Sequence, residues 1–99
     1  MEIGGSVYIM TNVHHTTLYT GVASDLYARV CEHREGVYPK SFTSRYNLFV
    51  LVYYENHHLI EEAIAREKQI KAGSRKAKEK LINAFNPEWK DLFDEIKGW

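Results

Sequence analysis

Residues 6–22 read SVYIMTNVHHTTLYTGV and contain two short segments, residues 6–11 and 17–22, whose composition favours β-strands. The polar connection between them is short, which indicates an antiparallel hairpin. Successive side chains of a strand point to opposite faces of a sheet. Tyr8 and Tyr19 can therefore point at one spot from neighbouring strands.

The segment after the hairpin is typical of a helix. Ser24 is the predicted N-cap, Asp25 lies in the favourable first turn, and Gly36 is the predicted end. Arg29 and His33 are four residues apart, so we expect both side chains on the same face of this helix.

The rest of the chain predicts one more strand and several helices. We expect a loop over residues 37–46, followed by a central strand within the apolar run of residues 48–54. A second helix is expected to begin at Asn56 or a nearby histidine and to end at Gly73, where Ser74 caps a third helix. The buried side of the second helix is predicted to consist of Ile60, Ala63, Ile64 and Ile70.

Asn86-Pro87 is expected to break the third helix, and a last amphipathic turn follows it. The order is β-β-α-β-α-α plus a C-terminal helix. It predicts one α+β domain over residues 1–99, with a small three-stranded antiparallel sheet flanked by helices.

Composition excludes several classes of protein. The 99 residues are 44% hydrophobic, yet no run of eighteen apolar residues exists to span a membrane. The start lacks the features of a secretion signal, and one cysteine cannot form an internal disulfide or a zinc ribbon. Neither histidine doublet, His14-His15 or His57-His58, has cysteine partners at zinc spacing, so we interpret them as turn and helix-start residues. We expect a cytoplasmic protein.

Charge is distributed unevenly although the net charge is zero. Residues 66–80 hold seven basic and two acidic side chains, whereas residues 87–99 hold two basic and four acidic ones. Such a basic stretch can contact nucleic-acid phosphates without reading sequence, or can simply be a solvated helix face. The candidates for phosphate contacts are Lys40, Arg45, Lys71, Arg75, Lys76 and Lys78.

Glu67 interrupts the apolar side of the second helix. It lies four residues after Ala63 and three before Ile70, which puts its carboxylate on that side or at its margin. An unpaired carboxylate is costly to bury. Glu67 should therefore pair with a cation, Arg29 or Lys71, or lie in a cleft where it can bind a metal.

Five residues on regular elements could face one site: Tyr8, Tyr19, Arg29, His33 and Glu67. Phosphodiester hydrolysis needs a base for the attacking water, a cation for the charge on phosphorus and a divalent ion for the leaving oxygen. A single carboxylate can hold Mg²⁺, which keeps most of its waters and binds substrate phosphate.

The motifs resemble those of the GIY-YIG nuclease family. SVY at residues 6–8 and YTG at residues 19–21 resemble the two halves of its signature, with Ser, Val and Thr in place of Gly, Ile and Ile. The helix with Arg29, the segment AREKQIK at residues 65–71 and NPEW at residues 86–89 follow in the family's order. The resemblance covers roughly residues 4–92.

The resemblance implies a metal-dependent endonuclease that hydrolyses DNA, with Mg²⁺ or alternatively Mn²⁺ as cofactor. It implies that Tyr8 or Tyr19 deprotonates the attacking water, and we favour Tyr8 as the nearer base. Arg29 would grip the scissile phosphate, His33 would assist in proton transfer or phosphate contact, and Glu67 would ligate the metal.

Other features of the resemblance are less specific. Asn86 is a candidate for supporting the site, with Asn83 as the alternative. No targeting domain is evident in the sequence, so we expect structure-selective cleavage or recruitment by a partner protein, and RNA stays open as a substrate. One alternative is a non-catalytic nucleic-acid binding module of the same fold. Another is a protein-interaction domain whose surface consists of Trp89, Leu92, Phe93, Ile96 and Trp99.

Overall fold

The computed structural model describes residues 3–99 and contains one sheet of three antiparallel strands. The strands are β1 (Gly5–Thr11), β2 (Leu18–Ala23) and β3 (Val50–His57), and they lie in the order β2-β1-β3. The α+β class and the predicted order of elements are confirmed. The central strand is β1 and not the later apolar run, because β1 pairs with both of the other strands.

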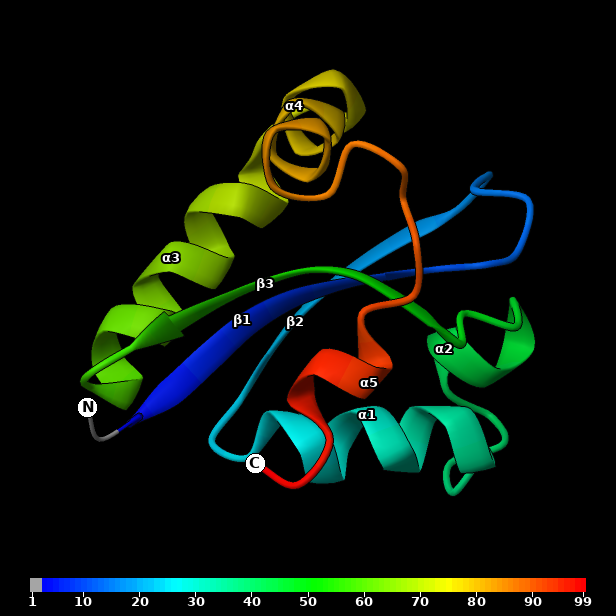
Figure 1. The fold of residues 1–99 in the computed structure, drawn as a ribbon, viewed down its shortest axis with the longest axis horizontal. Helices are drawn as coiled ribbons and strands as arrows, with labels where there is room; N and C mark the ends of the chain where they lie inside the picture. The colour runs from blue at the N-terminus through cyan, green and yellow to red at the C-terminus, as the bar shows by residue number, and fades with distance from the viewer. Residues whose placement is uncertain (1–2) are drawn as a thin grey trace.

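Helices cover both faces of the sheet, as Figure 1 shows. The helices α3 and α4 lie on one face, and α1 and α5 lie on the other. No helix within residues 3–99 is both long and apolar enough to cross a membrane. The helices are α1 (Leu26–Glu35), α2 (Phe42–Arg45), α3 (Ile60–Ala72), α4 (Arg75–Phe85) and α5 (Phe93–Ile96).

Alternation along β1 produces two hydrophobic clusters, one on each face. Tyr8 and Met10 point to the side of α1, whereas Val7 and Ile9 point to the side of α3 and α4. Both faces of the sheet are covered, which explains why the strands are apolar on both sides. Tyr8 is thereby fixed by the packing of the strand that carries it.

The ends of the helices differ from the prediction in two places. Asp25, not Ser24, is the N-cap of α1, and its carboxylate accepts a hydrogen bond from Ala28 N–H at 3.0 Å. Gly36 ends α1 with φ 66°, as predicted. The start of α3 is later than expected because β3 continues to His57 by pairing with β1.

Tertiary contacts account for the remaining differences in this region. Asn56 lies opposite Ser6 in the sheet and accepts a hydrogen bond from its hydroxyl at 2.7 Å, so Asn56 does not begin a helix. His57 is likewise a strand residue, which corrects its assignment to a helix start. Ile64 is 39% exposed, whereas Ala63 and Ile70 are buried, so the buried stripe of α3 is narrower than predicted.

The predicted loop over residues 37–46 contains the short helix α2. Ser41 is its N-cap, and its hydroxyl accepts a hydrogen bond from Ser44 N–H at 3.3 Å. Four residues are too few to display a helical period of apolar residues, so periodicity could not reveal this helix.

Part of the C-terminal segment belongs to the core. Leu92 and Ile96 are 3% and 0% exposed and pack in the cluster on the side of α1, which corrects their assignment to a protein-binding surface. Asn86 fastens the segment to β3, because its amide Nδ2 donates to the carbonyl oxygens of Val52 at 3.1 Å and of Lys90 at 2.8 Å.

Glu55 on β3 lies at the centre of a polar cluster. Its carboxylate accepts hydrogen bonds from the Tyr53 hydroxyl and from Arg66 Nε at 3.1 Å, and it pairs with His57 Nε2 at 3.0 Å. Burial opposes ionisation of Glu55, but the bonds from Arg66, Tyr53 and His57 outweigh it and lower its pKa below the ordinary 4.5.

We expect Glu55→Gln to lower the free energy of unfolding at about pH 7 by about 1–2 kcal/mol. Hydrogen bonds to a fully buried charged group contribute somewhat more than this, but the Glu55 carboxylate is partly exposed and solvent weakens its contacts. A carboxyl whose pKa is lowered on folding contributes stability above its unfolded pKa that is lost as the pH falls through its folded pKa. Urea unfolding should therefore show a difference between wild type and variant that shrinks towards about pH 3. A difference that is equal at both pH values would contradict this assignment.

Candidate active site

Tyr8 reaches across β2 at the position of a glycine. Tyr8 lies opposite Gly21 in the sheet, and a Cβ atom on Gly21 would come within 2.5 Å of the Tyr8 hydroxyl. The glycine that ends the second motif is therefore needed for space above β2. It lets the Tyr8 phenol lie over the edge strand, where it is 1% exposed.

The Tyr8 phenol belongs to a buried chain of hydrogen bonds. Its hydroxyl lies 2.8 Å from His33 Nε2, and His33 Nδ1 lies 2.9 Å from the Thr43 hydroxyl. Thr43 in turn lies 3.1 Å from the Ser41 hydroxyl. Sequence reasoning missed Thr43 because it lies on α2, and its only signal is the N-cap serine two residues before it.

The two ionisable groups in this chain of hydrogen bonds, Tyr8 and His33, are uncharged at neutral pH. Burial raises the pKa of Tyr8, and the neighbouring Tyr19 raises it further. Burial lowers the pKa of His33 below 6.5, and the positive charge of Arg29 lowers it further. One ring nitrogen of His33 therefore donates a hydrogen bond and the other accepts one.

Tyr19 is the more accessible of the two tyrosines. Its ring centroid lies 6.3 Å from that of Tyr8 and 5.8 Å from that of His33, so the two strands do bring the phenols together. Tyr19 also stacks on Phe42 of α2, with ring centroids 6.0 Å apart. It lines a hollow of about 350 Å³ together with Leu18, Thr20, Phe42, Lys71 and Lys78.

Arg29 lies on α1 and Glu67 on α3, on opposite faces of the sheet, and the charge of Arg29 lowers the pKa of the Tyr8 phenol whereas that of Glu67 raises it. Arg29 is 46% exposed, and its Nε lies 3.1 Å from Glu32. The Glu67 side chain is only 13% exposed, and its Oε2 lies 3.2 Å from Lys71 Nζ. Of the two predicted partners of Glu67, Lys71 is therefore the one it pairs with.

The carboxylates do not form a preformed metal cage. Among residues 3–99, no three His, Cys, Asp or Glu side chains are grouped closely enough to hold an ion. Glu67 pairs through Oε2, and its Oε1 forms no ion pair with any residue of the described range 3–99. This donor set fits a hard cation that keeps its waters and uses one carboxylate plus substrate phosphate.

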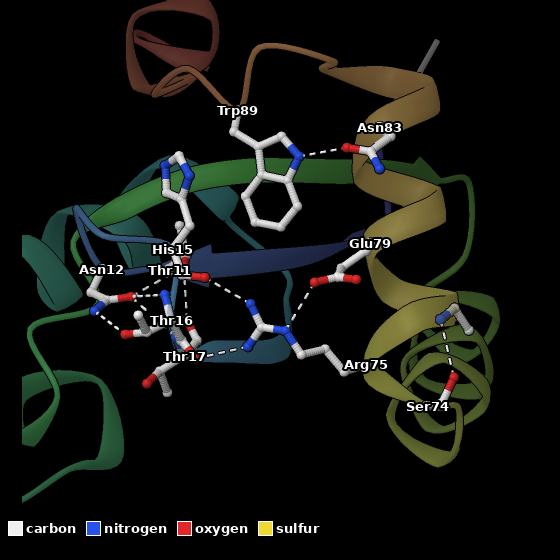
Figure 2. Close-up of polar contacts among 11 residues, drawn as sticks. Thr11, Asn12, His15, Thr16, Thr17, Ser74, Arg75, Glu79, Asn83 and Trp89 are labelled. Atoms are coloured by element: carbon white, nitrogen blue, oxygen red, sulfur yellow. Dashed lines mark hydrogen bonds and ion pairs between the residues drawn. The ribbon is translucent and has the colours of Figure 1, made fainter.

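The predicted phosphate contacts lie in different environments. Lys71 and Lys78 line the hollow beside Tyr19. Arg75 instead donates to the carbonyl oxygens of His15 and Thr16, both at 2.7 Å, as Figure 2 shows. Lys40, Arg45 and Lys76 are exposed on the surface. Asn86 holds backbone groups of the core, so its predicted support of the site stays a prediction.

Comparison with known proteins identifies relatives over most of the chain. A family described as GIY-YIG catalytic domain matches residues 4–82. A UPF0213 protein of Staphylococcus epidermidis is 40% identical over 76 residues, which cover 77% of this chain and 90% of the relative. A UPF0213 protein of Staphylococcus aureus is 41% identical over 66 residues, 67% of this chain and 79% of the relative. No solved structure matches the chain significantly.

Proposed function

The chain belongs to the GIY-YIG catalytic domain family, a family of nucleases, and from this premise we propose that it is an endonuclease that hydrolyses DNA phosphodiester bonds with Mg²⁺ or Mn²⁺. The observation that carries the proposal is that the rings of Tyr8 and Tyr19 lie 6.3 Å apart, and that Lys71, the ion-pair partner of Glu67, lies 5.8 Å from the centre of the Tyr19 ring. We further propose that it acts in the cytoplasm on DNA of a particular structure or through a partner protein that recruits it.

Arg29 is the residue that holds the charge of the scissile phosphate. Its guanidinium is 46% exposed and can exchange its contact with Glu32 for a phosphate at little cost, because exposed ion pairs contribute little. A fixed cation at the charge that develops on phosphorus is a large source of rate enhancement. Lys71, at the edge of the hollow, supplies a second positive charge.

Glu67 is the residue that would hold the divalent ion. Its side chain is largely buried, so the carboxylate is fixed in direction before substrate binds. When bound, the ion supplies positive charge for the leaving oxygen of the phosphodiester. Lys71 balances the charge of Glu67 until then.

The exposure of the two tyrosines favours Tyr19 as the phenol that meets the attacking water. Tyr19 lines the hollow, whereas Tyr8 is buried and bonded to His33. The Tyr19 oxygen takes a proton from water as its own proton leaves to solvent. Tyr8, His33 and Thr43 form the layer behind it and hold its ring in position.

The lowered pKa of His33 predicts the pH dependence of cleavage. We expect a constant rate through neutral pH and a decline only below about pH 6.5. An imidazolium donates from both ring nitrogens, so the buried hydroxyl that donates to neutral His33 loses its acceptor and the hydrogen-bond chain must rearrange. In His33→Gln, whose side chain does not ionise, the residual rate should lose this acidic decline. Rates measured against pH for both proteins test the assignment, and an unchanged decline in His33→Gln would exclude His33 as its cause.

Incubation of the purified chain with flapped, branched and single-stranded DNA in Mg²⁺ or Mn²⁺ tests the proposed function directly. A parallel incubation with RNA tests the substrate class. Cleavage that EDTA abolishes and that Arg29→Ala removes would support the proposal. Salt-sensitive binding without turnover on every substrate would instead show a non-catalytic module of the same fold.

A further inference from the structure

The hairpin between β1 and β2 meets the segment after α4 at a second hollow, which the proposed function leaves without a role. The rings of His15 and Trp89 lie there with centroids 5.0 Å apart. The hollow has a volume of about 290 Å³ and is lined by His15, Arg75, Glu79, Glu88 and Trp89. It brings together the first histidine doublet and the NPEW segment.

Hydrogen bonds hold the walls of this hollow in place. The Arg75 guanidinium is bonded to the backbone of the hairpin, and Figure 2 shows it directed towards the carbonyl oxygens of His15 and Thr16. The Trp89 indole N–H donates to Asn83 Oδ1 at 2.6 Å, which fixes the ring against α4. Because the aromatic rings are fixed in advance, a ligand would lose little by ordering them.

Both aromatic residues have strained backbone. His15 has φ 57° and Trp89 has φ 54°, in the left-handed region that bulky L residues seldom occupy. Such strain persists where the surrounding structure enforces it, and it is concentrated at functional and ligand-binding positions. Two facing aromatic residues in this conformation favour a binding role over mere packing.

The chemistry of the walls selects the ligand. A tryptophan and a histidine offer ring faces, and base–aromatic stacking is the usual way in which proteins hold single-stranded nucleic acid. Glu79 is paired with Arg75 at 3.0 Å, but Glu88 forms no hydrogen bond or ion pair within residues 3–99. A free carboxylate repels phosphate and accepts hydrogen bonds from the amino groups of bases.

We propose that this hollow binds one unpaired base of the DNA, and that it favours guanine. Guanine has two adjacent N–H donors on its pairing edge, which a carboxylate such as that of Glu88 can accept together, whereas thymine has no amino group. The inference rests on the proposed function for the identity of the nucleic acid. It gives the structure selectivity of that function a physical basis, since a base in an intact duplex is not free to enter.

The two hollows lie along one route. Lys78 lines the first hollow and Arg75, three residues earlier on α4, lines the second. His15 of the second hollow and Tyr19 of the first are four residues apart, so their Cα atoms are within about 14 Å of each other. A strand with about 3.4 Å between stacked nucleotides covers that distance in about four nucleotides. The same strand can thus reach the scissile position and place a base between His15 and Glu88.

The test uses the full chain with Glu67→Gln, which is expected to slow cleavage, and labelled ten-nucleotide strands of thymidine. Each strand carries guanine, thymine or an abasic site at one central position, and fluorescence anisotropy at fixed salt gives its affinity. We expect guanine to bind about tenfold more tightly than the abasic strand. A second substitution, Trp89→Leu, should remove that difference, Trp89→Phe should retain most of it, and Glu88→Gln should remove the preference for guanine over thymine.

Asn83→Ala is the matched control, because it removes the bond to the Trp89 indole without removing the ring. It should lower thermal stability and leave the guanine preference in place. Equal affinity for guanine and abasic strands would overturn the inference, even if the wild-type chain cleaves DNA. Discrimination between these strands without any cleavage by the wild type would overturn the proposed function and leave the inference standing.

Discussion

Replacing Glu67 with glutamine is expected to lower the rate of DNA cleavage by about 10²–10³-fold, the size of effect seen when one fixed charge-stabilising group is removed from an active site. The carboxylate is largely buried and pairs through Oε2 with Lys71, so the amide fits the same space. An amide is a weaker ligand for a hard cation than a carboxylate. Single-turnover cleavage measured over a range of Mg²⁺ concentrations checks this expectation.

Affinity for DNA should behave differently from rate in Glu67→Gln. Removing one negative charge beside Lys71 leaves more positive charge for phosphate, so binding should be unchanged or tighter. The matched control is Glu61→Gln, on an exposed position of the same helix, and it should retain the wild-type rate. Persistent cleavage by Glu67→Gln would show that this carboxylate is not the metal ligand or that the activity comes from a contaminating nuclease.

The fold could be predicted from local patterns wherever a pattern extends over several residues. Residue composition identified β1 and β2. Gly36 marked the end of α1 because glycine tolerates the left-handed backbone conformation, φ 66°, that ends this helix. The end of β3 could not be predicted in this way. His57 belongs to the strand because Gly5 pairs with it, and such a contact between distant residues has no signature in the local sequence.

The residue types of the site could be predicted from the sequence, but the burial of each side chain could not. Spacing placed Tyr8 and Tyr19 at one spot and Glu67 at the edge of an apolar stripe. The structure brings the two phenols together and pairs Glu67 with Lys71, which lies 5.8 Å from the centre of the Tyr19 ring. The spacing of residues does not predict which of the two phenols is exposed to solvent. Tyr8 is buried against α1, and its partner His33 is bonded to Thr43 on α2, more than thirty residues further along the chain than Tyr8.

Substitution of each tyrosine by phenylalanine is expected to distinguish the tyrosine that transfers a proton from the one that holds the site in position. Tyr19→Phe should lower the cleavage rate by about 10²–10⁴-fold, as expected for loss of a group that transfers a proton. Its unfolding free energy should hardly change, because the Tyr19 hydroxyl makes no hydrogen bond within residues 3–99, and the ring keeps its stacking on Phe42. Quenched-flow cleavage and urea unfolding of the same preparations give both quantities.

Tyr8→Phe should lower the free energy of unfolding more, and the cleavage rate less, than Tyr19→Phe does. Loss of its hydroxyl leaves His33 Nε2 buried without its partner, which costs about 1–3 kcal/mol of unfolding free energy. The rate should fall less than in Tyr19→Phe, because a displaced imidazole disturbs the Tyr19 ring only indirectly. If Tyr8→Phe abolishes cleavage while Tyr19→Phe spares it, then Tyr8 is the base. Substrate binding would in that case have to open the layer that buries Tyr8, since a phenol that is 1% exposed cannot otherwise reach water.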